Sequence, residues 1–147
     1  MKKAIFILIG VAMIAGCTPS PQPINYGTDL CNHCQMTIVD RQHAGEAVTR
    51  KGKVYKFDAI ECMVNYVNVH QESEWAILLA GDYNRPGEMI DALTGSYLIS
   101  KAIPSPMGAY LSAFANTEEA GMVQSEKGGE IYDWSQLRTK LGPNTPQ

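Results

Sequence analysis

The stretch Cys31–Met36, CNHCQM, holds the residues of this chain that are best suited to chemistry. Cys31 and Cys34 have the C-x-x-C spacing, His33 lies between them, and Met36 follows two residues later. Four kinds of site use such a set: a disulfide, a thiol–disulfide redox pair, half of a zinc site, or a site for a soft metal ion. The surrounding sequence decides how well each of them fits.

A disulfide between Cys31 and Cys34 is the simplest interpretation for an exported protein, because thiols outside the cytoplasm tend to be oxidised. A thioredoxin-like redox pair needs a strand before the motif and a helix that begins at the cysteines. Here a proline-rich segment precedes Cys31, and the residues after the motif are β-prone. The redox interpretation is therefore kept as the alternative, a periplasmic thiol–disulfide oxidoreductase that uses Cys31 and Cys34.

Zinc could take Cys31 and Cys34 together with His33 or His43. Structural zinc sites, however, usually have a second pair of ligands at finger-like spacing, and Cys62 stands alone. Thiolate and thioether sulfur together select Cu(I), whereas zinc gains little from methionine sulfur. The motif thus favours Cu(I), with zinc as a non-physiological occupant. His43 lies in polar surroundings and is expected to be a solvated loop residue.

A second soft donor is Met107, which lies between Pro106 and Gly108. Proline restricts the backbone and glycine permits a tight turn, so Met107 is expected on a shaped loop, either as a metal ligand or as an apolar residue that fills the core. Cys62 lies one position away from the apolar stripe of a predicted helix. It is a weaker metal candidate, as is His33, whereas Met63 and Met89 are expected in the core.

The N-terminus has the features of an export signal. Lys2 and Lys3 precede an apolar run that ends in small residues before Cys17, and the run is shorter than the ~20 residues of a membrane-spanning helix. The residues around Cys17 resemble a bacterial lipobox, which predicts a lipid thioether on this cysteine. We expect a signal peptide over residues 1–16, a lipidated N-terminus and flexible tether over 17–28, and one domain over 29–147.

Charge and length narrow the function further. The 147 residues carry a formal net charge of −3, which becomes two units more negative when the leader and its two lysines are removed. Basic residues are not clustered, so nucleic acid is not an expected partner. The mature chain has about 120 residues, enough for a single compact domain with a modest core.

The periodicity of the chain predicts a mixture of strands and helices without regular alternation, which is the α+β class. A hairpin is expected over residues 48–57, and a helix over 58–69 in which Asp58 caps the N-terminus and Glu61 completes a capping box. Asn116 and Asp133 are expected to cap two later helices. The remaining strands are predicted over residues 75–80, 97–99, 110–114 and 130–132, so the second half faintly repeats the first.

These residues resemble the NosL family of lipoprotein copper chaperones, which are encoded with nitrous oxide reductase. The resemblance consists of the lipobox at Cys17, CNHCQM, FDAIECM over residues 57–63 and SPMG over residues 105–108, in the family's order. Together they span most of the mature chain. Gln35 stands where the family motif commonly has glycine, so the resemblance leaves the geometry of this loop open.

The resemblance implies two similar ββαβ halves, akin to the organomercurial lyase fold. It implies Cu(I) ligands at Cys31, Cys34, Met36 and Met107, with the division between the two cysteines open. It also implies a non-enzymatic protein that is lipid-anchored in the cell envelope, facing the periplasm or the exterior. The implied partners are an ABC-type maturation complex and the reductase itself. A metal-free assembly lipoprotein is a weaker alternative.

Overall fold

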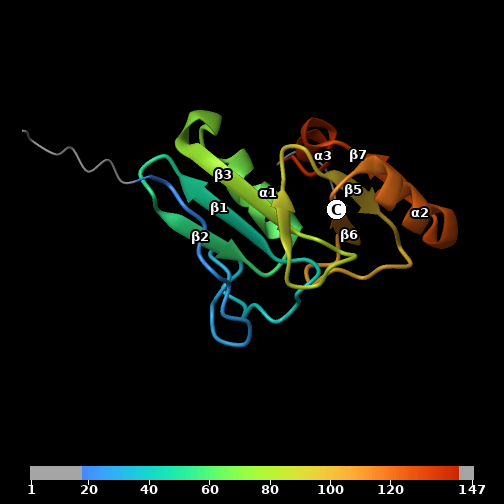
Figure 1. The fold of residues 1–147 in the computed structure, drawn as a ribbon, viewed down its shortest axis with the longest axis horizontal. Helices are drawn as coiled ribbons and strands as arrows, with labels where there is room; N and C mark the ends of the chain where they lie inside the picture. Colours follow the sequence, from blue (N-terminus) through green and yellow to red (C-terminus); the bar gives the residue numbers. More distant parts are fainter. Residues whose placement is uncertain (1–17, 143–147) are drawn as a thin grey trace, which may run out of the picture.

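The computed structural model describes residues 18–142 and has two ββαβ units in succession (Figure 1). The first consists of β1 (Gly45–Thr49), β2 (Val54–Phe57), α1 (Ile60–Asn68) and β3 (Trp75–Gly81). The second consists of β5 (Ser96–Ile99), β6 (Leu111–Phe114), α2 (Thr117–Lys127) and β7 (Glu130–Tyr132). A 3₁₀ turn (Glu72–Glu74), β4 (Met89–Asp91) and α3 (Trp134–Lys140) complete the chain. This order confirms the α+β class and is consistent with two similar halves.

Each unit forms its own antiparallel sheet, and in both sheets the first strand of the unit lies between the other two strands of that unit. The strand order is β2-β1-β3-β4 in one sheet and β6-β5-β7 in the other. Figure 1 shows the two sheets side by side along the long axis of the molecule. A single parallel bridge between Asp82 and Ala113 joins the connection after β3 to β6. The strand β4 was not predicted.

Helix α1 lies where the two units meet, since it packs on β1 and β2 and also contacts β6 and α3. Its apolar residues Ile60, Met63, Val64 and Val67 recur at helical spacing and are all buried. Each of these side chains contributes about 1.5–3 kcal/mol by burial. The predicted stripe is therefore confirmed, and it is this stripe that fixes the helix against the first sheet.

The predicted capping of α1 is wrong. The N-cap is Ala59, which has an extended backbone and no side chain that could accept a hydrogen bond. Asp58 and Glu61 instead turn their carboxylates into the interior, where they meet other partners. The capping signals of the other helices are confirmed: Asn116 accepts from the Glu119 N–H, and Asp133 forms a full capping box with Gln136.

His43 is buried, contrary to the expectation of a solvated loop residue. Its Nδ1 lies 2.9 Å from Asp40 Oδ2, and its Nε2 lies 3.2 Å from Ser112 Oγ. The three side chains have the order of a hydrolase triad, but Ser112 is fully buried in β6, where no substrate could reach it. The array therefore joins the two units by hydrogen bonds, because Asp40 and His43 precede β1 and Ser112 belongs to the second sheet.

The segment before Cys31 lies against the first sheet and contains a turn at residues 26–28. The Gln22 N–H donates to the buried carboxylate of Glu46 on β1 at 2.7 Å, and Lys56 Nζ donates to the Pro23 carbonyl at the same distance. The Arg41 guanidinium lies over the Tyr26 ring. From Gln22 onward, the segment expected as a tether is thus attached to the domain.

The predicted signal peptide and Cys17 lie outside the described residues. Within residues 18–142, every helix is too short or too polar to span a lipid bilayer.

Candidate metal centre

Cys31 and Cys34 lie in a tight turn that is attached to β2. The Cys31 N–H donates to the Met36 carbonyl at 2.8 Å, and Leu30 and Thr37 form a bridge that closes the loop. Asn32 bonds to Lys56 twice, through its N–H to the Lys56 carbonyl and through its side-chain oxygen from the Lys56 N–H. Because β2 leads directly into α1, these bonds hold the turn against the start of that helix.

Four side chains meet there: Cys31 and Cys34 from the turn, Asp58 directly after β2, and Cys62 from the first turn of α1. Their ligand atoms all lie within 4.8 Å of one another, and we call this group the thiol cluster. Cys31, Cys62 and Asp58 are 0%, 1% and 3% exposed, whereas Cys34 is partly exposed. The cluster therefore has a buried floor and one thiol that reaches the surface.

All three cysteines of the thiol cluster are free thiols. The N–H groups of His33 and Cys34 point at Cys31 Sγ from 3.4 and 3.5 Å, and Cys34 Sγ donates to Asp58 Oδ1 at 3.3 Å. Asp58 Oδ2 is buried without a hydrogen-bond partner among the described residues. A buried acceptor of this kind is costly unless something else satisfies it, and a bound cation would do so.

The thiols differ in acidity because of their positions. A hydrogen bond from the Cys62 thiol lowers the pKa of Cys31 to about 6, although burial opposes this shift. Burial raises the pKa of Cys34 to about 11, and the neighbouring Asp58 and Cys31 add to the rise. The hydrogen bond with Cys31 raises the pKa of Cys62 as well. Near neutral pH the cluster thus contains one thiolate, on Cys31, whereas Cys34 and Cys62 remain thiols.

The two methionines predicted as ligands are both exposed at the surface. Met36 is 51% exposed, and its backbone carbonyl accepts the Cys31 N–H. Met107 is 42% exposed and lies in a loop whose Ser105 side chain and Ala109 N–H both bond to Glu61, the neighbour of Cys62 in α1. The structure therefore brings both methionine-bearing loops to the same end of α1 as the thiols.

His33, a weaker candidate, is exposed and contributes its backbone N–H to the cluster. Cys62, the other weaker candidate, is one of the four members of the cluster. Asp58 was missed as a candidate ligand because its position before a helix was explained by capping. One signal could have indicated Asp58: it lies four residues before Cys62, at the start of the helix. Residues with this spacing lie near the same end of the helix.

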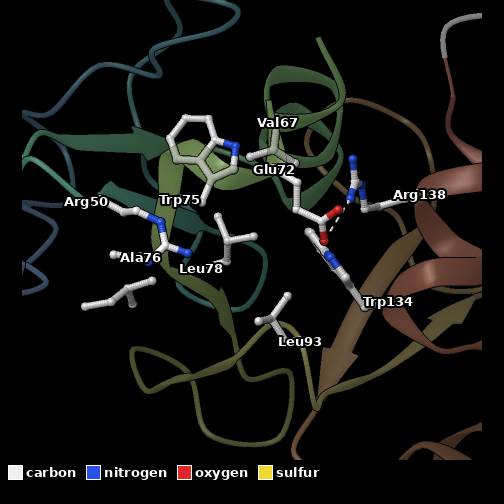
Figure 2. A pocket seen from close by; sticks show the side chains of 10 residues that line it. Arg50, Val67, Glu72, Trp75, Ala76, Leu78, Leu93, Trp134 and Arg138 are labelled. Carbon is white, nitrogen blue, oxygen red and sulfur yellow. Dashed lines mark ion pairs between the residues drawn. The ribbon is translucent and has the colours of Figure 1, made fainter. Parts of the chain in front are cut away.

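A separate cleft of about 190 Å³ lies beside β3, where α3 comes close to the first unit (Figure 2). Trp75, Trp134 and Leu93 are among its apolar walls. Its charged groups already have partners in the protein: Arg138 lies 3.7 Å from Glu72, and Arg50 Nε donates to the Ser73 carbonyl. The described residues that line it include no member of the thiol cluster, so the cleft is not part of the candidate site.

Comparisons with known proteins show the family and the fold. The NosL family model matches residues 23–141. The structure is similar to the crystal structure of the copper chaperone NosL from Shewanella denitrificans, with a TM-score of 0.70 and 19% sequence identity. The alignment covers 80% of this chain and 94% of that chain, so the fold is shared over nearly the whole of that protein. No curated protein matches the chain.

The family match extends from the segment before Cys31 to the residue after α3, and thus includes the CNHCQM turn, the start of α1 and the Met107 loop. It confirms the resemblance that these motifs indicated. The chain belongs to the NosL family.

Proposed function

We propose that this protein is a Cu(I) carrier that takes up the ion at the thiol cluster and hands it to a recipient, without catalysing a reaction. The observation that carries the proposal is the convergence of three free thiols on one carboxylate, within 4.8 Å, at the end of α1 where Met36 and Met107 are exposed. Soft sulfur ligands of this kind select Cu(I).

The arrangement suits an ion that must be released again. Cys34 is the partly exposed member of the thiol cluster, and the thioethers of Met36 and Met107 lie outside it. Cu(I) is stable with few soft ligands, so it could pass from an exposed thiolate to a ligand of another protein one bond at a time. A structural site would instead enclose its metal with a full set of protein ligands.

Electrostatics favour a cation at this position. Asp58 and Glu61 are both buried, and neither takes part in an ion pair among residues 18–142. Together with the Cys31 thiolate they give the region an excess of negative charge. A positive ion would therefore be attracted more strongly there than at the protein surface.

Zinc could occupy the same residues, because three thiolates and one carboxylate are a set that Zn²⁺ accepts. The exposed methionines add nothing to a zinc site, whereas they are good ligands for Cu(I). We therefore propose copper as the physiological cargo and zinc as a non-physiological occupant.

The redox alternative receives less support from the geometry. Cys31 is fully buried, so a protein substrate could reach the pair only through Cys34. The turn is followed by the short bridge at Thr37, and α1 begins only at Ile60, so the cysteines do not open a helix as in thioredoxin-like proteins.

Family membership motivates the rest of the proposal. We propose that Cys17 carries a lipid that anchors the protein to a bacterial membrane in the cell envelope. The recipient would be an ABC-type maturation complex or nitrous oxide reductase itself.

Copper binding is tested by titrating the reduced soluble domain, residues 18–147, with Cu(I) under anaerobic conditions against a competing chelator. We expect one tightly bound Cu(I) per chain and a large loss of affinity in Cys34→Ser. Cys17 is absent from this domain, so every thiol measured belongs to the cluster. Weak binding that Cys34→Ser leaves unchanged, or turnover of a disulfide substrate that depends on Cys31 and Cys34, would replace the carrier with the redox alternative.

Delivery is tested in cells. Deleting the gene under copper limitation should yield nitrous oxide reductase that is exported and folded but poor in copper. Excess copper in the medium should partly restore its activity. A fully metallated reductase in the deletion strain would show that the copper reaches it by another route.

A further inference from the structure

Both sides of the Met107 loop are attached to one oxygen atom. Ser105 Oγ donates to Glu61 Oε1 at 2.5 Å, and the Ala109 N–H donates to the same oxygen at 3.4 Å. The two donors lie two residues before and two residues after Met107. A single carboxylate oxygen therefore fixes the loop symmetrically about the methionine.

The loop is also shaped internally. The Gly108 N–H donates to the Ser105 carbonyl at 3.0 Å, which closes a tight turn with Met107 at its third position. Gly108 has a φ of 79°, a left-handed value that glycine adopts without strain. The turn leaves Met107 exposed, while Ser105 on its inner side is buried.

Glu61 is an unusual residue for this position. Its side chain is buried, the residue being 2% exposed, and its Oε2 lacks a hydrogen-bond partner among the described residues. A buried, unpaired carboxylate oxygen lowers stability, so packing alone does not explain this residue. Its place in the first turn of α1 compensates in part, because the helix dipole favours a negative charge there.

Glu61 also lies next to Cys62 in the chain. The helical turn that contributes a thiol to the thiol cluster therefore also holds the loop that carries Met107. Neither the loop nor the turn of α1 can shift independently while these hydrogen bonds persist.

We infer that Glu61 is a positioning residue that holds Met107 at the thiol cluster, ready to bind Cu(I). This inference rests on the proposed function, because it assumes that Met107 is a ligand. Glu61 itself does not touch the ion; it limits the conformations of the loop before copper arrives. Partners that orient metal ligands in this way typically change metal affinity by about 10–100-fold.

The decisive experiment is a double-mutant cycle on the soluble domain, with Cu(I) affinity as the readout. Glu61→Leu removes the acceptor and keeps a similar volume, and Met107→Leu removes the thioether. If Glu61 acts through Met107, each variant weakens binding by about 10–100-fold and the double variant is no weaker than the worse single one. Additive losses would show that Glu61 acts by another route and would overturn the inference.

Two further variants distinguish a positioning role of Glu61 from an effect of its charge and from a loss of protein stability. Glu61→Gln keeps an acceptor oxygen and removes the charge, so a positioning role predicts near wild-type affinity. Equal losses in Glu61→Gln and Glu61→Leu would instead indicate that the charge matters. Should Glu61→Leu fail to fold, Ser105→Ala removes one of the two hydrogen-bond donors to Glu61 instead. The loss of Cu(I) affinity caused by Ser105→Ala should also disappear when Met107 is already leucine.

A matched control is Glu46→Gln, since Glu46 is a buried glutamate on β1 that accepts the Gln22 N–H. This variant should leave Cu(I) affinity unchanged. Methyl NMR of Met107, labelled with ¹³C, gives an independent readout: the Cu(I)-induced shift of its signal should be lost in Glu61→Leu and retained in Glu61→Gln and Glu46→Gln.

The outcomes separate this inference from the proposed function. If the wild-type domain does not bind Cu(I), the proposed function fails. If it binds Cu(I) and Met107→Leu has no effect, or if the cycle is additive, only the role of Glu61 fails.

Discussion

The Cys34 thiol donates a hydrogen bond to the buried carboxylate of Asp58, with 3.3 Å between Sγ and Oδ1. The two residues are 24 positions apart, and their contact joins the CNHCQM turn to the start of α1. While the carboxylate accepts this hydrogen bond, the thiol form of Cys34 is favoured. A metal ion that binds Cys34 must therefore displace a proton that the protein holds firmly.

The first prediction concerns pH. Cys31 has a pKa of about 6 and is a thiolate above that pH, whereas Cys34 has a pKa of about 11 and stays a thiol up to alkaline pH. Binding of Cu(I) to both sulfurs between pH 7 and 9 then releases one proton, so the apparent affinity should rise about tenfold per pH unit.

The size of the rise in affinity per pH unit also tests the role of Cys62. If this thiol becomes a third thiolate ligand, two protons leave and the rise should be about 100-fold per unit. The change of Cu(I) affinity with pH is measured by chelator competition at several pH values, corrected for protonation of the chelator. An affinity that does not change with pH would contradict thiolate binding at Cys34. In Cys34→Ser, one proton fewer should be released per Cu(I) bound.

The second prediction concerns Asp58 and metal selectivity. Carboxylate oxygen is a suitable ligand for Zn²⁺ and a poor one for Cu(I). Asp58→Asn should therefore weaken zinc binding by about tenfold or more while Cu(I) affinity stays the same or rises. A rise is expected because the variant lowers the cost of deprotonating Cys34. Competition titrations with both metals measure the two affinities.

A control for this variant is Asp133→Asn, which changes the same residue type at the start of α3 and keeps a good N-cap. It should alter neither affinity. An equal loss of copper and zinc binding in Asp58→Asn would place Asp58 among the Cu(I) ligands or show that it maintains the fold of the cluster.

The third prediction concerns Met107. Because its side chain is 42% exposed, Met107→Leu should change the melting temperature little, and conservative apolar swaps cost less than about 1.5 kcal/mol even in cores. Cu(I) affinity should nevertheless fall. Met122→Leu is the matched control, since Met122 is an exposed methionine on α2. A lower melting temperature with unchanged affinity would make Met107 an apolar packing residue.

The fourth prediction concerns the anchor. Cys17→Ser in an expressing bacterium should give uncleaved or soluble protein in place of the lipidated form, because the lipid is attached through the thiol. Fractionation of the cells and mass spectrometry of the N-terminus measure the outcome. Unchanged processing and membrane association in this variant would exclude a lipid on Cys17.

Local signals in the sequence predicted much of the fold. The stripe of α1, the caps at Asn116 and Asp133, and the hairpin after β1 all depend on residues within about four positions of each other, so their spacing alone fixes them. The errors at Asp58 and Glu61 have the same origin. Both residues have the spacing of a capping box, and only the tertiary structure shows that the interior offers each carboxylate another partner.

His43 shows the same limit. Its polar neighbours indicated a solvated loop, but its ring is buried because Ser112, 69 positions later, supplies a hydrogen bond. No local pattern contains that partner.

For the candidate site, the sequence by itself determined the candidate ligands and the family. CNHCQM and SPMG identified soft sulfur donors, and their order along the chain predicted NosL membership. Only the tertiary structure decided that Cys62 and Asp58 join Cys31 and Cys34, because β2 and α1 must first pack before residues 24 to 31 positions apart can meet. Ligand type is a property of single residues, whereas a binding site is a property of distances between them, and those distances are set by long-range packing.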